Sequence, residues 1–161
     1  MNCPTVAAST PIAPRTGDGV LPLNSRLELA ALLTAPGCAR AHVRAILLEW
    51  GLRDVAETAQ LLVSELVTNS VQASGRLKTR ADLPLVPVIR LWVASDRVSV
   101  VIHVWDASDD LPIRREAGVD EISGRGLMII DTLAKDWGSY RQASGKVVWA
   151  VVGPEAAGGR R

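Results

Sequence analysis

The segment Leu61–Ser74, LLVSELVTNSVQAS, constrains the fold more than any other part of this 161-residue chain. Its apolar residues recur at helical spacing, which predicts an amphipathic helix with one face against a core. Glu65 and Asn69 are four residues apart, so a carboxylate and a carboxamide share one helix face. Such oxygen donors suit a Mg²⁺–phosphate site, because Mg²⁺ is usually held by one or two protein oxygens together with substrate phosphates. Taken alone, an ordinary surface or capping pair is the simpler interpretation.

The composition indicates one globular domain with a largely aliphatic core, and it does not favour a nucleic-acid or membrane partner. Lysine plus arginine number 18 and aspartate plus glutamate 17, so the net charge is +1, and this balance does not favour direct binding of nucleic acid. No segment reaches the roughly 18 apolar residues of a membrane span, and residues 1–22 lack the apolar run of a secretory signal. Cys3 and Cys38 are too few for a metal site, and we expect no disulfide between them. A cytoplasmic protein without a membrane partner is therefore expected.

The two ends of the chain differ in composition from the part between them. Residues 1–22 and 154–161 are rich in proline, glycine and small residues, and we expect a disordered arm and a flexible tail. One domain is expected over 23–153. Within it, periodicity predicts a strand at 26–31, helices at 37–50 and 54–74, strands at 88–94 and 98–106, a helix at 126–134, and strands at 137–142 and 146–152.

The short connections within the strand pairs define the fold class. They predict antiparallel hairpins, since a parallel crossover needs about a dozen residues or more. Asp54, followed by Glu57 three residues later, is expected to cap the second helix. We therefore expect an α+β fold, a two-layer sandwich in which helices cover one face of a mostly antiparallel sheet.

Asp106 ends an apolar strand and is a candidate ligand-binding residue. Alternation along the strand places it on the same side as Ile102 and Val104. If that side faces the helices, this carboxylate lies at the edge of the core and needs a hydrogen-bonding partner. A ligand amino group, such as the exocyclic amine of adenine, would serve. The alternative is a strand-ending aspartate that caps the turn at Ser108.

The sequence Ser123-Gly124-Arg125-Gly126 precedes the last predicted helix. Two glycines allow close approach of a ligand to the backbone, and a helix N-terminus favours phosphate. Arg125 could add a charge-assisted hydrogen bond to a phosphate oxygen. Two common phosphate motifs are absent: no glycine-rich loop ends in Gly-Lys-Ser/Thr, and the dinucleotide-binding fingerprint lacks its third glycine and its preceding strand.

Four segments occur in an informative order: SELVTNSVQAS, VWDASDDLP, GRGLMIIDTLAKDWG and GKVVWAVV. Together they resemble the ATPase domains of the gyrase, heat-shock chaperone, histidine kinase and mismatch-repair (GHKL) superfamily. Within that superfamily the chain looks most like the anti-sigma-factor serine kinases. The resemblance covers about residues 26–152. It implies a Bergerat-type ATP site between the sheet and the helices.

The resemblance also implies a role for each matching residue. Asn69 would bind Mg²⁺, Glu65 would be the catalytic base that orients or deprotonates the attacking hydroxyl, and Asp106 would bind the adenine amine. A short lid over the nucleotide would span about 113–123. In the last strand, Val147 stands where a threonine often contacts the adenine region. The other residues expected to contact the nucleotide are Ser108, Gly124, Arg125, Gly126 and Leu127.

Two functions follow from the resemblance. The first is an ATP- and Mg²⁺-dependent protein serine kinase that phosphorylates a small antagonist protein, while the unphosphorylated antagonist competes with a sigma factor for the kinase. The second is a non-catalytic regulator, with or without ATP, that sequesters a partner. Glu65 favours the first, because a binding module needs no base at that position. Trp92 and Trp105, expected on the less covered face of the sheet, are compatible with a homodimer or a protein partner there. The alternative is that the N-terminal arm covers this face.

Overall fold

The computed structural model describes residues 21–77, 86–109, 111–112, 124–142 and 144–154. The predicted arm and tail lie almost entirely outside these residues, as does the predicted lid over 113–123. Within the described part, the elements in chain order are β1 (Leu23–Ala30), α1 (Ala35–Glu49), α2 (Arg53–Gly75), β2 (Val88–Ser95), β3 (Val100–Asp106), α3 (Gly124–Leu133), β4 (Asp136–Gln142) and β5 (Gly145–Val152).

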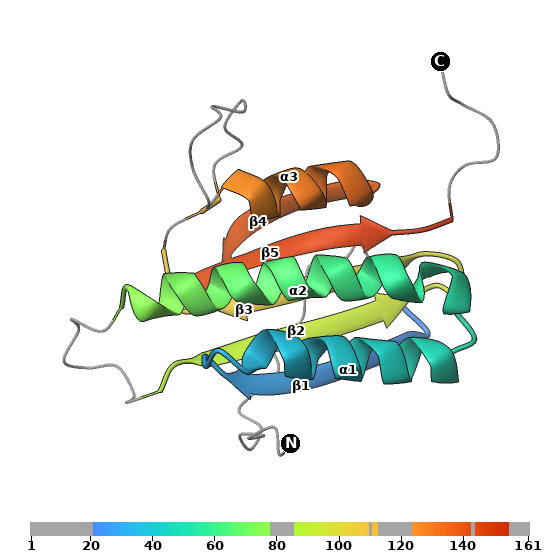
Figure 1. The fold of residues 1–161 in the computed structure, drawn as a ribbon, viewed down its shortest axis with the longest axis horizontal. Helices are drawn as coiled ribbons and strands as arrows, with labels where there is room; N and C mark the ends of the chain where they lie inside the picture. The colour runs from blue at the N-terminus through green and yellow to red at the C-terminus, as the bar shows by residue number, and fades with distance from the viewer. Residues whose placement is uncertain (1–20, 78–85, 110, 113–123, 143, 155–161) are drawn as a thin grey trace.

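The strands form one antiparallel sheet in the order β1-β2-β3-β5-β4. Figure 1 shows α1, α2 and α3 packed on the same face of this sheet. The middle helix, α2, packs against both other helices and against β3 and β5. The predicted α+β fold with helices on one face of an antiparallel sheet is therefore confirmed.

The core lies between the sheet and the helices. Alternate side chains of each strand point to this side, and in β3 they are Val100, Ile102 and Val104, with Asp106 next in the same phase. The long helix α2 provides the opposite wall. Its buried residues are Val55, Ala56, Ala59, Leu62, Val63, Leu66, Val67, Ser70, Ala73 and Ser74.

The predicted capping role of Asp54 is wrong. The N-cap of α2 is Leu52, and no side chain makes a cap hydrogen bond there. Leu52 packs against the core, so hydrophobic packing places the N-cap of the helix two residues earlier than the capping signal suggested. Asp54 lies inside the first turn, where its charge interacts favourably with the helix dipole.

The expectation for the cysteines is also wrong. Cys38 in α1 is disulfide-bonded, and Cys3, the other cysteine of the chain, lies outside the described residues. Sequence spacing does not show whether two cysteines come within bonding distance in the fold. Among the helices that the structure describes, none has the length and hydropathy needed to cross a membrane.

The face of the sheet away from the helices is rich in aromatic side chains. Trp92 and Trp105 lie there, as predicted, because they alternate with the core residues of β2 and β3. Trp92, His103 and Trp149 lie opposite one another on neighbouring strands. The Arg26 guanidinium lies 4.0 Å from the centre of the Trp92 ring, a cation–π contact. A homodimer through this face stays a prediction.

Candidate functional site

Glu65 and Asn69 of α2 meet the start of α3 at Gly126. A Cβ built on Gly126 would lie 2.8 Å from Glu65 Oε2 and 3.3 Å from Asn69 Oδ1. Any larger residue at this position would therefore push against both side chains. Glu65 and Asn69 are half-buried, and both direct oxygen atoms toward the same short stretch of α3. The structure thus brings together three of the residues that the sequence analysis selected, from two distant segments.

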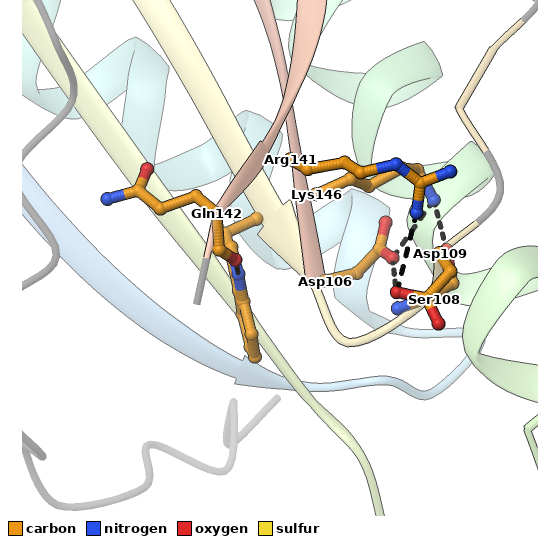
Figure 2. Close-up of polar contacts among 7 residues, drawn as sticks. Asp106, Ser108, Asp109, Arg141, Gln142 and Lys146 are labelled. Carbon is orange, nitrogen blue, oxygen red and sulfur yellow. Dashed lines mark hydrogen bonds and ion pairs between the residues drawn. The ribbon is translucent and has the colours of Figure 1, made fainter. Parts of the chain in front are cut away.

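Asp106, at the end of β3, is completely buried, with an exposed fraction of 0%. Its Oδ1 accepts a 2.9 Å hydrogen bond from the backbone N–H of Ser108. The same oxygen accepts a 3.0 Å bond from Nζ of Lys146, which also donates to Ser108 Oγ. Figure 2 shows the three side chains converging from β3, the turn after it, and β5. The turn-capping alternative for Asp106 therefore holds, although it uses only one carboxylate oxygen.

The second carboxylate oxygen of Asp106 is the unusual feature of this cluster. Oδ2 is buried and has no hydrogen-bond partner among the residues that the structure describes. A buried acceptor without a donor is costly. The amino group of a bound ligand would supply the missing donor, as the sequence analysis expected for adenine.

Lys146 is the functional candidate that the sequence analysis missed. It lies directly opposite Asp106 in the antiparallel pairing of β3 with β5, and the residue is buried, with an exposed fraction of 5%. The alternation of β5 contained the signal, because Val148, Ala150 and Val152 are core residues and position 146 is in phase with them. Val147, considered instead for the adenine region, pairs with Trp105 in the opposite phase.

Gly145 allows β5 to approach the end of β3 closely. A Cβ at this position would collide with the Asp106 carbonyl oxygen and would lie 2.8 Å from the Trp105 ring. The Trp105 indole N–H in turn donates a 3.0 Å hydrogen bond to the Gln142 carbonyl oxygen. These contacts fix the start of β5 beside β3 and so place the lysine next to the aspartate.

The remaining predicted residues have different surroundings. Gly124 opens α3, and the side chain of Arg125 lies outside the described part of the structure. Leu127 is half-buried and packs against the core. Asp109, just beyond the cluster, has a 3.7 Å ion pair with Arg141 (Figure 2). Both of those side chains are largely exposed, so this pair adds little stability.

The two clusters lie at one end of the molecule. In Figure 1 the C-terminal half of α2, the end of β3, the beginning of β5 and the beginning of α3 are all on the left. Contacts of α2 with α3, β3 and β5 join these parts. A buried carboxylate oxygen, a helix N-terminus and a carboxylate–amide pair at one end offer partners for a base, for phosphates and for a hard cation, respectively.

The two oxygen donors, Glu65 and Asn69, are enough for a Mg²⁺ ion whose remaining ligands are phosphate oxygens and water. Glu65 and Asn69 provide hard oxygen atoms around the space that a Cβ at Gly126 would fill, and Mg²⁺ commonly takes only one or two protein oxygens when phosphates complete its shell. Within the described ranges, no group of three or more His, Cys, Asp or Glu side chains is arranged to hold a metal ion.

Sequence comparison provides an independent result. The profile of the histidine kinase-like ATPase domain matches residues 29–152, which run from the end of β1 to the end of β5 and include every site residue discussed above. No curated protein matches the chain.

Proposed function

Because the chain belongs to the family of histidine kinase-like ATPase domains, we propose that it binds MgATP at this end of the sheet and transfers the γ-phosphate to a protein serine. The observation that carries the proposal is the meeting of Glu65, Asn69 and Gly126 across α2 and α3. A carboxylate and an amide oxygen facing a helix N-terminus are suited to handling a phosphate chain and its cation.

In this proposal each cluster has its own task. Asp106 Oδ2 accepts a hydrogen bond from the adenine amine, which satisfies the unpartnered buried oxygen. Asn69 Oδ1 provides the protein ligand of Mg²⁺, and the backbone N–H groups at the start of α3, from Gly124 to Gly126, face the phosphates. When bound, Mg²⁺ neutralises part of the phosphate charge during transfer.

Glu65 is the proposed general base. Its carboxylate accepts the proton of the serine hydroxyl as the serine oxygen forms a bond to the γ-phosphorus. The bond between the γ-phosphorus and the β–γ bridging oxygen breaks, and the bridging oxygen leaves with ADP. A base of this kind contributes about 10²- to 10⁴-fold to the rate.

The proposed acceptor is a serine on a small antagonist protein that competes with a sigma factor for this kinase. A second candidate is a regulator that binds ATP, or does without it, and sequesters its partner without phosphate transfer. The hydrogen bond from Lys146 to Asp106 Oδ1 supports an ATP-free form of this candidate, because it satisfies one carboxylate oxygen within the protein. Transfer of labelled γ-phosphate to a serine separates the two.

The binding site is tested with Asn69→Ala. We expect calorimetric titration to show Mg²⁺-dependent ATP binding by the wild-type protein and its loss in this variant. The control is Gln60→Ala on the same helix, since the Gln60 amide bonds to the Ala56 carbonyl of its own helix. Equal ATP affinity in Asn69→Ala and Gln60→Ala would remove the assigned cation site.

The catalytic step is tested with Glu65→Gln. We expect ATP affinity to stay within about threefold and serine phosphorylation to fall by about 10²- to 10⁴-fold, because the amide cannot accept the proton. Glu57→Gln, at an exposed position of α2, is the matched control. Labelled seryl phosphate is measured after incubation of each variant with γ-labelled ATP and the proteins of the source cell. Wild-type transfer by Glu65→Gln would show that this residue is not the base.

A further inference from the structure

Lys146 presents a hydrogen-bond donor beside the unpartnered oxygen of Asp106. An ammonium group has three N–H donors. Two of them are used by Asp106 Oδ1 and Ser108 Oγ, and no other acceptor within the described residues contacts Nζ. The buried pair therefore offers a ligand one acceptor, Oδ2 of Asp106, and one donor, the third N–H of Lys146, side by side.

We propose that Lys146 is a second specificity-determining residue for the nucleotide base, and that it donates a hydrogen bond to N1 of adenine while Asp106 Oδ2 accepts from the 6-amino group. This inference rests on the proposed ATP binding at the same site. The edge of adenine carries an N–H donor directly beside a nitrogen acceptor, which complements the acceptor and donor that the ion pair presents.

The same cluster disfavours guanine. Recognition of guanine by a carboxylate uses both oxygens, because N1–H and the 2-amino group are adjacent donors. In this protein Oδ1 of Asp106 is occupied by the backbone N–H of Ser108 and by Lys146, so only Oδ2 is available. Even if a bound guanine paired its N1–H with Oδ2 and its O6 with Lys146, its 2-amino group would lack an acceptor in this cluster, and a site rejects a ligand strongly when a buried polar group remains unpaired.

A purely structural role explains the burial of Lys146 less well. A buried ion pair adds little net stability compared with apolar side chains of similar size, because both charges lose their hydration. The cost rises further while the third ammonium proton and Oδ2 lack partners. A single base edge would satisfy both groups at once, and Gly145 is positioned so that β5 can hold the lysine there.

The test needs no substitution in its first part. The affinities of the wild-type full-length protein for Mg²⁺-ATP and Mg²⁺-1-deaza-ATP are compared by calorimetry, since 1-deaza-ATP keeps the amine and replaces N1 with C–H. We expect about 10- to 100-fold weaker binding of the analogue, the size associated with one hydrogen bond to a charged group. GTP is expected to bind at least as weakly as the analogue.

The second part uses Lys146→Met, which removes the donor and keeps the apolar stem. We expect this variant to bind ATP and 1-deaza-ATP with equal affinity, whereas the control Lys135→Met, at an exposed position, keeps the wild-type ratio. Lys146→Arg, which retains a charged donor, is measured as well in case loss of the ion pair unfolds the methionine variant. We expect it to discriminate between the two nucleotides.

Three outcomes overturn the inference. Equal affinity of the wild-type protein for ATP and 1-deaza-ATP would show that Lys146 does not contact N1, although the proposed ATP binding would stand. Tighter ATP binding by Lys146→Met than by the wild type would show that the lysine competes with the base. Failure of the wild type to bind either nucleotide with Mg²⁺ would overturn the proposed function as well.

Discussion

Asp106 and Lys146 are buried together, and removing one charge leaves the other without its partner. Asp106→Ala is therefore expected to destabilise the protein by about 3–5 kcal/mol, the usual cost of breaking a buried pair on one side. Replacing both residues, as Asp106→Leu with Lys146→Met, is expected to restore most of that stability because no buried charge remains. Urea unfolding measures both effects. A single variant within about 0.5 kcal/mol of the wild type would contradict the burial of the pair.

The double variant also distinguishes a loss of stability from a loss of ATP binding. It should fold but should not bind ATP, since it lacks both the acceptor and the donor for the base. Recovery of ATP binding together with stability would mean that the base lies elsewhere.

His103 makes stability depend on pH. Burial lowers the pKa of this imidazole from its ordinary 6.5 to about 4. The unfolded chain therefore binds a proton that the folded protein excludes, so this contribution to stability is fully present above about pH 6.5 and is lost as pH falls toward 4. The slope is at most about 1.4 kcal/mol per pH unit for one group. Urea unfolding at several pH values between 7 and 4 measures it.

His103→Gln is expected to flatten this dependence but not abolish it. Burial also lowers the pKa of His42, whose Nε2 lies 2.9 Å from Ser25 Oγ, and that group acts in the same direction. Asp96 does not interfere, because hydrogen bonds from the Ser99 and Val98 backbones lower its pKa below 3.8, outside this window. An unchanged slope in His103→Gln would refute the assignment.

At the scale of elements, the contact between α2 and α3 depends on glycine at position 126, because glycine has no side chain. Gly126→Ala suits a helix and could gain up to about 1 kcal/mol in propensity, but its Cβ would displace Glu65 Oε2 and Asn69 Oδ1. We expect stability to change by no more than about 1 kcal/mol and serine phosphorylation to fall by about 100-fold, because a displacement near 1 Å can have that effect on a catalytic group.

The matched control is Gly37→Ala in α1, where the added methyl group would make only an ordinary 3.6 Å contact with the Arg40 side chain. Thermal unfolding and the phosphate-transfer assay are compared for the two variants. Similar transfer rates in Gly37→Ala and Gly126→Ala would show that the meeting of α2 with α3 is not important for catalysis.

Periodicity in the sequence predicted each helix and strand of the described part to within a few residues, because apolar spacing reports which face of each element is buried. It also predicted the side of β3 on which Asp106 lies. It did not predict Lys146, because a lysine in a strand is normally assumed to face water. Nor could it predict the contact of Glu65 with Gly126, which depends on how two helices pack across the sheet.

At the scale of the whole molecule, the candidate site joins parts that are distant in the chain, namely α2, the end of β3 with the start of β5, and α3. A ligand that contacts all three should stabilise the folded state as a unit. MgATP at about 100 times its Kd is expected to add about 2.7 kcal/mol, or roughly 5–10 °C in Tm for a chain of this length. Differential scanning fluorimetry measures the shift. Asn69→Ala should show none at the same concentration, and an equal shift without Mg²⁺ would argue against the proposed cation site.

The most direct measurement is a crystal structure of the protein with Mg²⁺ and a non-hydrolysable ATP analogue. We predict the adenine amine within hydrogen-bond distance of Asp106 Oδ2, N1 within the same distance of Lys146 Nζ, and Mg²⁺ bound to Asn69 Oδ1 beside Glu65. A nucleotide bound on another face, with the Asp106–Lys146 pair and the Asn69 amide both out of contact, would contradict this prediction.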